Sequence, residues 1–167
     1  MFNLHSHFVS ENSIYNAYLT SFKEPTGWFS LGIHPWYISS NWKSLLLNFV
    51  FCKDVVAIGE CGLDRVCETD FELQKEVFQA QIDLAEKLNK PLIIHCVKAH
   101  NDCELLLRNV QVPVIFHGFN AKYTVLKQLL KHEHFYFSFG TATFNSSLKA
   151  TIDNCPLDKM FIAPADR

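Results

Sequence analysis

Two kinds of hydrophobic pattern alternate along the chain. Short apolar runs rich in β-branched and aromatic residues predict strands, and longer segments whose apolar residues return every three or four positions predict helices. Strands are expected at residues 2–7, 28–34, 55–60, 91–96, 113–117, 135–139 and 159–162, with a weaker candidate at 13–20. Helices are expected between them, within residues 42–51, 70–89, 100–110, 122–132 and 145–154.

The helical pattern is clearest over residues 70–89, where Phe71, Phe78 and Leu88 belong to one apolar stripe. Asp70 is the expected N-cap, and Lys87 lies near the C-terminal end, where a cation suits the helix dipole. Strands that alternate with helices imply parallel pairing. The fold class is therefore α/β, either a doubly wound sheet or a closed (β/α)8 barrel of the TIM type. At 167 residues the chain is short for a barrel.

Polar residues at the strand ends separate these two architectures. His5 and His7 share one face of the first strand, because side chains alternate with period two. Four later strands finish with a similar residue, at His34, Glu60, His95 and His117. Each alone has a simpler interpretation as a hydrogen-bonded structural residue or a capping carboxylate. Together they favour a barrel, because the catalytic groups of barrels come from the ends of different strands. Imidazole and carboxylate donors suit Zn²⁺, Mn²⁺ or a similar divalent ion.

Composition and charge narrow the possible functions and the expected location. A net charge of −2 argues against a basic surface that holds nucleic acid by charge alone. Neither a signal peptide nor a membrane span is expected, so the predicted location is the cytoplasm. The six cysteines form no C-x-x-C pair and are expected as reduced thiols. Lys98 either meets an anion or is a solvated surface lysine. The remaining histidines are interpreted as surface or helix-end residues, namely His100, His132 and His134.

Five motifs then occur in order: NLHSH, LGIHPW, AIGECGLD, KPLIIHCVKAH and VIFHGF. Together they resemble the TatD-type metal-dependent deoxyribonucleases, a branch of the amidohydrolase-like (β/α)8 barrels, over nearly the whole chain. The resemblance implies two divalent metal ions (Mg, Mn or Zn) at the barrel mouth. It implies that His5 and His7 bind the first ion, that Glu60 binds both, and that His95 and His117 hold the second. The implied substrate is DNA or another phosphodiester, with His34 in contact with substrate or water at the rim and Lys98 a weaker substrate contact.

The C-terminus departs from the family pattern. The family ends its eighth strand with Glu-Thr-Asp, whose aspartate is a metal ligand and general base, and a further helix follows. Here Ala163, Pro164 and Ala165 occupy that place, and Asp166 comes one residue late. A slip of one residue turns a side chain to the other face of a strand. We therefore expect a single barrel domain over residues 1–167, short and lacking the final helix, with Glu60 as a catalytic residue and Asp166 in a doubtful catalytic position.

Three functions stay open at this point. The first is a phosphodiesterase of the TatD type, active or weakened by the altered C-terminus. The second is a degenerate relative that binds metal or a partner without catalysis. The third is an amide or lactone hydrolase on the same barrel. Because members of that class often carry a carbamylated lysine where Glu60 stands, Glu60 favours the first. The sequence predicts neither the metal nor the oligomeric state.

Overall fold

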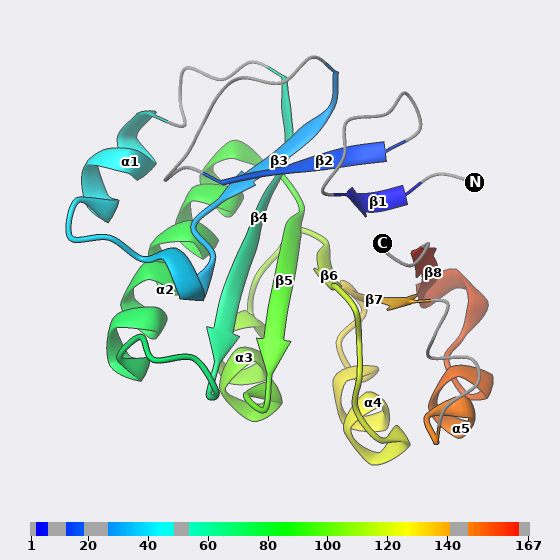
Figure 1. Cartoon of the computed structure of the whole chain (residues 1–167). Coiled ribbons are helices and arrows are strands. Elements are labelled where there is room, and N and C mark those ends of the chain that lie inside the picture. Colours follow the sequence, from blue (N-terminus) through cyan, green and yellow to red (C-terminus); the bar gives the residue numbers. More distant parts are fainter. Residues whose placement is uncertain (1–2, 7–12, 19–26, 49–53, 141–146, 164–167) are drawn as a thin grey trace.

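A parallel sheet of eight strands forms the centre of the molecule (Figure 1). The computed structural model describes residues 3–6, 13–18, 27–48, 54–140 and 147–163. The strands are β1 (Asn3–Ser6), β2 (Ser13–Tyr18), β3 (Phe29–Gly32), β4 (Val55–Asp64), β5 (Leu92–Val97), β6 (Val114–Phe116), β7 (Phe135–Gly140) and β8 (Met160–Ala163). They follow one another in chain order, and β1 contacts β8. The sheet therefore curls on itself, which confirms the predicted TIM-type α/β fold.

Helices connect the strands from β3 onward. They are α1 (Trp42–Asn48), α2 (Phe71–Leu88), α3 (His100–Leu107), α4 (Tyr123–Leu129) and α5 (Lys149–Asp153), with short 3₁₀ helices η2 (Pro35–Tyr37) and η5 (Leu157–Lys159). The predicted cap of α2 is confirmed, because the Leu73 N–H donates to the Asp70 carboxylate over 2.9 Å. Within the described ranges, none of the helices combines the length and the apolar character that a membrane span needs.

Aromatic side chains fill much of the core. Phe29, Phe135, Phe137 and Phe139 have no exposed surface, and Phe116 stacks on Phe137 with ring centroids 5.7 Å apart. Burying a phenylalanine side chain contributes about 1.5–3 kcal/mol relative to leaving it in water. Packing of these aromatic side chains holds the strands in place. The carboxyl ends of the strands can therefore carry polar side chains.

The strand that carries Glu60 runs further than predicted. We expected it to close at Glu60, but β4 continues to Asp64, so this boundary was wrong. The extension pairs Cys61 with Ile94 and Asp64 with Val97 on β5. Glu60 therefore lies inside its strand, and Asp64 occupies the strand end.

Candidate metal and catalytic site

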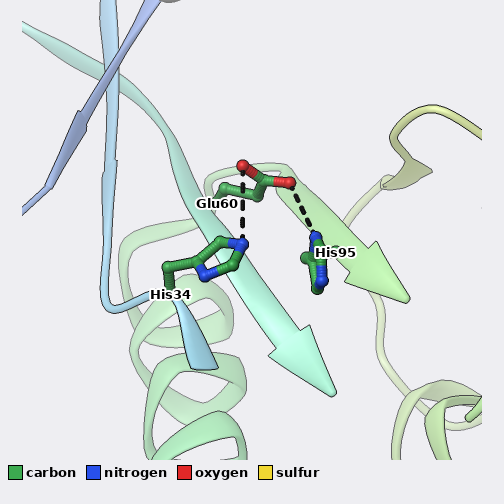
Figure 2. A group of neighbouring side chains, drawn as sticks. All are labelled: His34, Glu60 and His95. Atoms are coloured by element: carbon green, nitrogen blue, oxygen red, sulfur yellow. Dashed lines mark hydrogen bonds and ion pairs between the residues drawn. The ribbon is translucent and has the colours of Figure 1, made fainter. Parts of the chain in front are cut away.

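Three side chains from three neighbouring segments meet at this end of the sheet (Figure 2). His34 follows β3, Glu60 lies in β4 and His95 lies in β5. Each offers a ligand atom, and these atoms all lie within 4.8 Å of one another. Glu60 stands between the rings, with Oε2 4.0 Å from His34 Nε2 and Oε1 3.2 Å from His95 Nδ1. The donor set is the mixture of imidazole and carboxylate that divalent transition metals bind.

Two glycines of the GECG motif allow β4 to approach β5 around Glu60. Gly59 has φ 138° and Gly62 has φ 140°, a region that side chains rarely adopt. A Cβ at Gly59 would lie 2.3 Å from the carbonyl oxygen of Ile93, and one at Gly62 would lie 2.0 Å from that of His95. The motif therefore needs glycine at both positions to bring Glu60 and His95 together.

Asn16 on β2 holds Glu60 through two contacts. Its Oδ1 accepts the backbone N–H of Glu60 over 2.9 Å, and its Nδ2 donates to Glu60 Oε2 over 3.4 Å. Ser30 on β3 donates to the same amide oxygen. Asn16 and Glu60 are both buried, so these bonds act in a region of low dielectric, where they are stronger than in water. The carboxylate therefore has a fixed direction.

Asp64 orients His95 from the other side of the ring. Its buried Oδ2 lies 2.9 Å from His95 Nε2 and accepts the indole N–H of Trp36 over 2.7 Å. Burial opposes the charge of Asp64, but hydrogen bonds from His95, Trp36 and Val66 outweigh it and hold the pKa of this carboxyl below its usual range. Burial likewise opposes the charge of His95, but its bonds to Glu60 and Asp64 raise the pKa of this imidazole.

Two buried glutamines of α2 hold the strand ends that lead into the site. Gln81 Oε1 accepts the N–H of Ile33 over 2.7 Å, and Gln81 Nε2 donates to the Ile33 carbonyl over 3.1 Å. Gln74 makes the same pair of bonds with the backbone of Asp64, over 2.8 and 3.0 Å. Ile33 immediately precedes His34, so α2 fixes the backbone beside His34 and at Asp64.

The hydrogen bond to Nδ1 determines the tautomer of His34. The backbone N–H of Trp36 donates to this nitrogen over 3.2 Å. A neutral ring that accepts at Nδ1 carries its proton on Nε2, the nitrogen that faces Glu60. In this tautomer His34 is a hydrogen-bond donor at the edge of the cluster, so Glu60 and His95 are the members of the three that keep lone pairs directed toward a metal.

A cavity of about 590 Å³ adjoins the cluster and gathers more of the predicted residues. Glu60, His95, His117 and Lys98 line it. His100 begins α3, which confirms the helix-end interpretation, and it also lines the cavity. His5 lies in β1, and its side chain is outside the part of the chain that the structure describes. His7 and Asp166 lie outside the described residues.

Sequence reasoning missed several residues of this site. They are Asn16, Asp64, Gln74 and Gln81. Asp64 stands at the end of the GECGLD segment, so its place in a motif was a usable signal. Gln74 and Gln81 lie within the segment predicted as a helix, but nothing in the chain near them indicates which distant backbone groups they bind.

Comparisons with known proteins place the chain in a family. The family model described as TatD related DNase matches residues 5–163. An uncharacterised metal-dependent hydrolase from Buchnera aphidicola is 28% identical over 172 residues, covering 94% of this chain and 63% of that protein. A 3′-5′ ssDNA/RNA exonuclease TatD from Pantoea ananatis is 42% identical over 78 residues, covering 44% of this chain and 30% of that protein.

A solved structure shows the same architecture. The TatD homologue YJJV from Escherichia coli K12 matches with a TM-score of 0.72 at 22% identity, over 82% of this chain and 57% of that chain. This likeness supports the barrel fold alone. The chain also spans less than two thirds of the curated relatives named above. Since the family model covers nearly all of its length, however, the chain belongs to the TatD related DNase family.

Proposed function

We propose that this chain is a metal-dependent hydrolase that cleaves phosphodiester bonds in nucleic acid. The observation that carries the proposal is the convergence of His34, Glu60 and His95 beside a cavity that His117 also lines. A buried carboxylate among imidazoles matches the donor chemistry that a divalent metal requires. Membership of the TatD related DNase family and the exonuclease name of the Pantoea relative support nucleic acid as the substrate.

The proposed ligand set follows the family pattern. His5 and His7 would hold one divalent ion, His95 and His117 would hold another, and Glu60 would contribute its carboxylate to both sites. His95 Nε2 contacts Asp64 while Nδ1 faces Glu60, so Nδ1 is the nitrogen directed toward the proposed ions. When bound, two divalent ions supply the charge that activates water and stabilises the leaving oxygen. Mg²⁺, Mn²⁺ and Zn²⁺ all suit this set of imidazole and carboxylate donors.

The chain's own residues position the substrate. His34 carries its proton on Nε2 and donates a hydrogen bond to a phosphate oxygen or to water. Lys98, exposed at the cavity wall, pairs with a backbone phosphate of the substrate. Asn16 and Asp64 hold Glu60 and His95, so the acceptor atoms keep their directions when the substrate enters. Asp166 is the proposed general base, because it is the aspartate nearest the family's position for that role.

The test measures metal content and cleavage on the same purified chain. We expect inductively coupled plasma mass spectrometry to detect bound metal after loading with Mg²⁺, Mn²⁺ or Zn²⁺. We expect an end-labelled single-stranded oligonucleotide to be shortened by the loaded chain. Glu60→Gln removes the shared carboxylate and is expected to lower kcat/KM by about 10²-fold or more. Glu133→Gln changes an exposed glutamate in the turn before β7 and serves as the matched control.

Two outcomes would overturn the proposal. Bound metal without turnover of DNA, RNA or a small phosphodiester would favour a degenerate relative. Turnover of a carboxylic ester, lactone or amide without phosphodiester cleavage would favour the other hydrolase class. Asp166→Ala decides the general base separately, because full activity in that variant together with loss in Glu60→Gln would make Asp166 dispensable.

A further inference from the structure

A second hollow opens beside the candidate site. It has a volume of about 320 Å³, and Arg65, Lys98, His100 and Asp102 are among the residues that line it. Lys98 and His100 also line the cavity that contains Glu60. The two hollows therefore meet at Lys98 and His100, and a chain-like ligand that leaves the first can continue into the second.

Arg65 is held in this hollow by three contacts. Its backbone N–H donates to the Val97 carbonyl over 3.1 Å, at the carboxyl ends of β4 and β5. Its guanidinium lies 4.1 Å from the centroid of the Phe71 ring. Nε and Nη2 both donate to Asp102 Oδ2, over 3.3 and 2.8 Å. The side chain nevertheless stays 48% exposed, so it is fixed in place without being covered.

The hollow carries more positive than negative charge. Within the described part of the chain, Nη1 of Arg65 makes no hydrogen bond, and neither does the ammonium group of Lys98. The negative charge of Asp102 neutralises one of these two cations, so one positive charge remains in the hollow. Lys98 directly follows β5 with φ 52°, a left-handed conformation that is uncommon for a residue with a side chain. Such conformations concentrate at ligand-binding sites.

We propose that Arg65 and Lys98 bind the phosphate next to the one that is cleaved, in a nucleic-acid strand that runs from the cavity into this hollow. The proposal rests on the proposed function, since it places a second phosphate relative to the first. Arginine suits this role, because its planar fork of N–H donors matches phosphate oxygens. Contacts of this kind position a strand without reading its sequence. The expected ligand is therefore an oligonucleotide of any sequence with at least two phosphates.

The experiment compares a substrate that has the second phosphate with one that lacks it. The first is a single-stranded decanucleotide, and the second is bis(p-nitrophenyl) phosphate. Arg65→Ala is expected to lower kcat/KM for the decanucleotide about 10-fold further than for the small diester, through a higher KM. It is also expected to reduce the slope of log kcat/KM against log salt by about 0.7, the value for one phosphate contact in a single strand. Lys43→Ala, on exposed α1, is the control for loss of a surface cation.

The two proposals fail in different ways. If the wild-type chain with metal hydrolyses neither substrate, the proposed function fails, and fluorescence anisotropy with a labelled decanucleotide still tests the hollow. In that assay we expect Arg65→Ala to bind about 10-fold more weakly than both wild type and Lys43→Ala. Equal affinity and an equal salt slope in Arg65→Ala and Lys43→Ala would overturn the inference, even with full cleavage activity. Arg65→Lys keeps the charge and is expected to restore the salt slope but only part of the affinity.

Discussion

Replacing Asp64 with asparagine tests whether this carboxylate orients His95. In the wild type, Oδ2 accepts the Trp36 indole N–H over 2.7 Å and lies 2.9 Å from His95 Nε2, while Oδ1 accepts the Val66 N–H over 2.7 Å. Asparagine has one oxygen for these three donors. Either orientation of the amide therefore points its NH₂ group at a neighbouring N–H.

The expected magnitudes follow from this mismatch. A buried donor that loses its partner destabilises the folded state by about 1–3 kcal/mol, and Asp64 is 2% exposed. At about 2–4 °C per kcal/mol for a chain of this size, Asp64→Asn should lower Tm by roughly 2–12 °C. Losing the group that orients a metal-binding histidine should weaken metal affinity about 10–100-fold.

The assay is thermal unfolding of the metal-free chain together with a metal titration by calorimetry. Asp83→Asn is the matched control, because Asp83 is exposed on α2 and accepts its bond from Gln79. A variant at Asp64 with the wild-type Tm and the wild-type metal affinity would refute the orienting role. A lowered Tm with unchanged metal affinity would make Asp64 a structural residue only.

Three further predictions rest on the same site. The pKa of His95 is raised above 6.5 in the folded chain. Its contribution to the free energy of unfolding is therefore complete below pH 6.5 and is lost as pH rises through the raised pKa. Urea unfolding of wild type and His95→Gln across this pH range measures the contribution. Gln81→Leu leaves the buried N–H and C=O of Ile33 without these partners and should lower the free energy of unfolding by about 2–5 kcal/mol. Urea unfolding measures this change against Gln79→Leu, which removes a half-buried glutamine of the same helix that bonds to Asp83. Gly62→Ala places a Cβ against the His95 carbonyl and should abolish high-affinity metal binding or folding; wild-type metal affinity in this variant would contradict the close approach of β4 and β5.

The barrel could be predicted because its signals are local and repeated. Apolar runs and helical stripes alternate along the chain, and parallel strands in one sheet place their carboxyl ends together. That rule anticipates the meeting of His34, Glu60 and His95 from three segments. The end of β4 was not predictable in the same way, because Cys61 to Asp64 extend the strand by pairing with β5 and by the bonds of Gln74 to Asp64.

The residues behind the site were harder to predict because their partners lie far away in the chain. Asn16 binds Glu60, and Gln81 binds Ile33. A buried amide and an exposed amide look alike in a sequence, since the difference depends on which backbone group approaches in the folded chain. The place of His100 beside the cavity was hard to predict for the same reason, because it depends on where the start of α3 lies relative to the end of β5 in the folded chain.

The two glutamines of α2 explain how the barrel mouth can hold polar side chains in fixed positions. Gln74 and Gln81 lie two helical turns apart, so they project from the same face of α2. Each binds one N–H and one C=O at the end of a strand, groups that would otherwise remain without partners where the sheet ends. Apolar residues at these positions could pack as well but could not satisfy those groups. The outer helix therefore supports the backbone of β4 and of the segment after β3, which leaves the side chains of His34 and Asp64 available for the site.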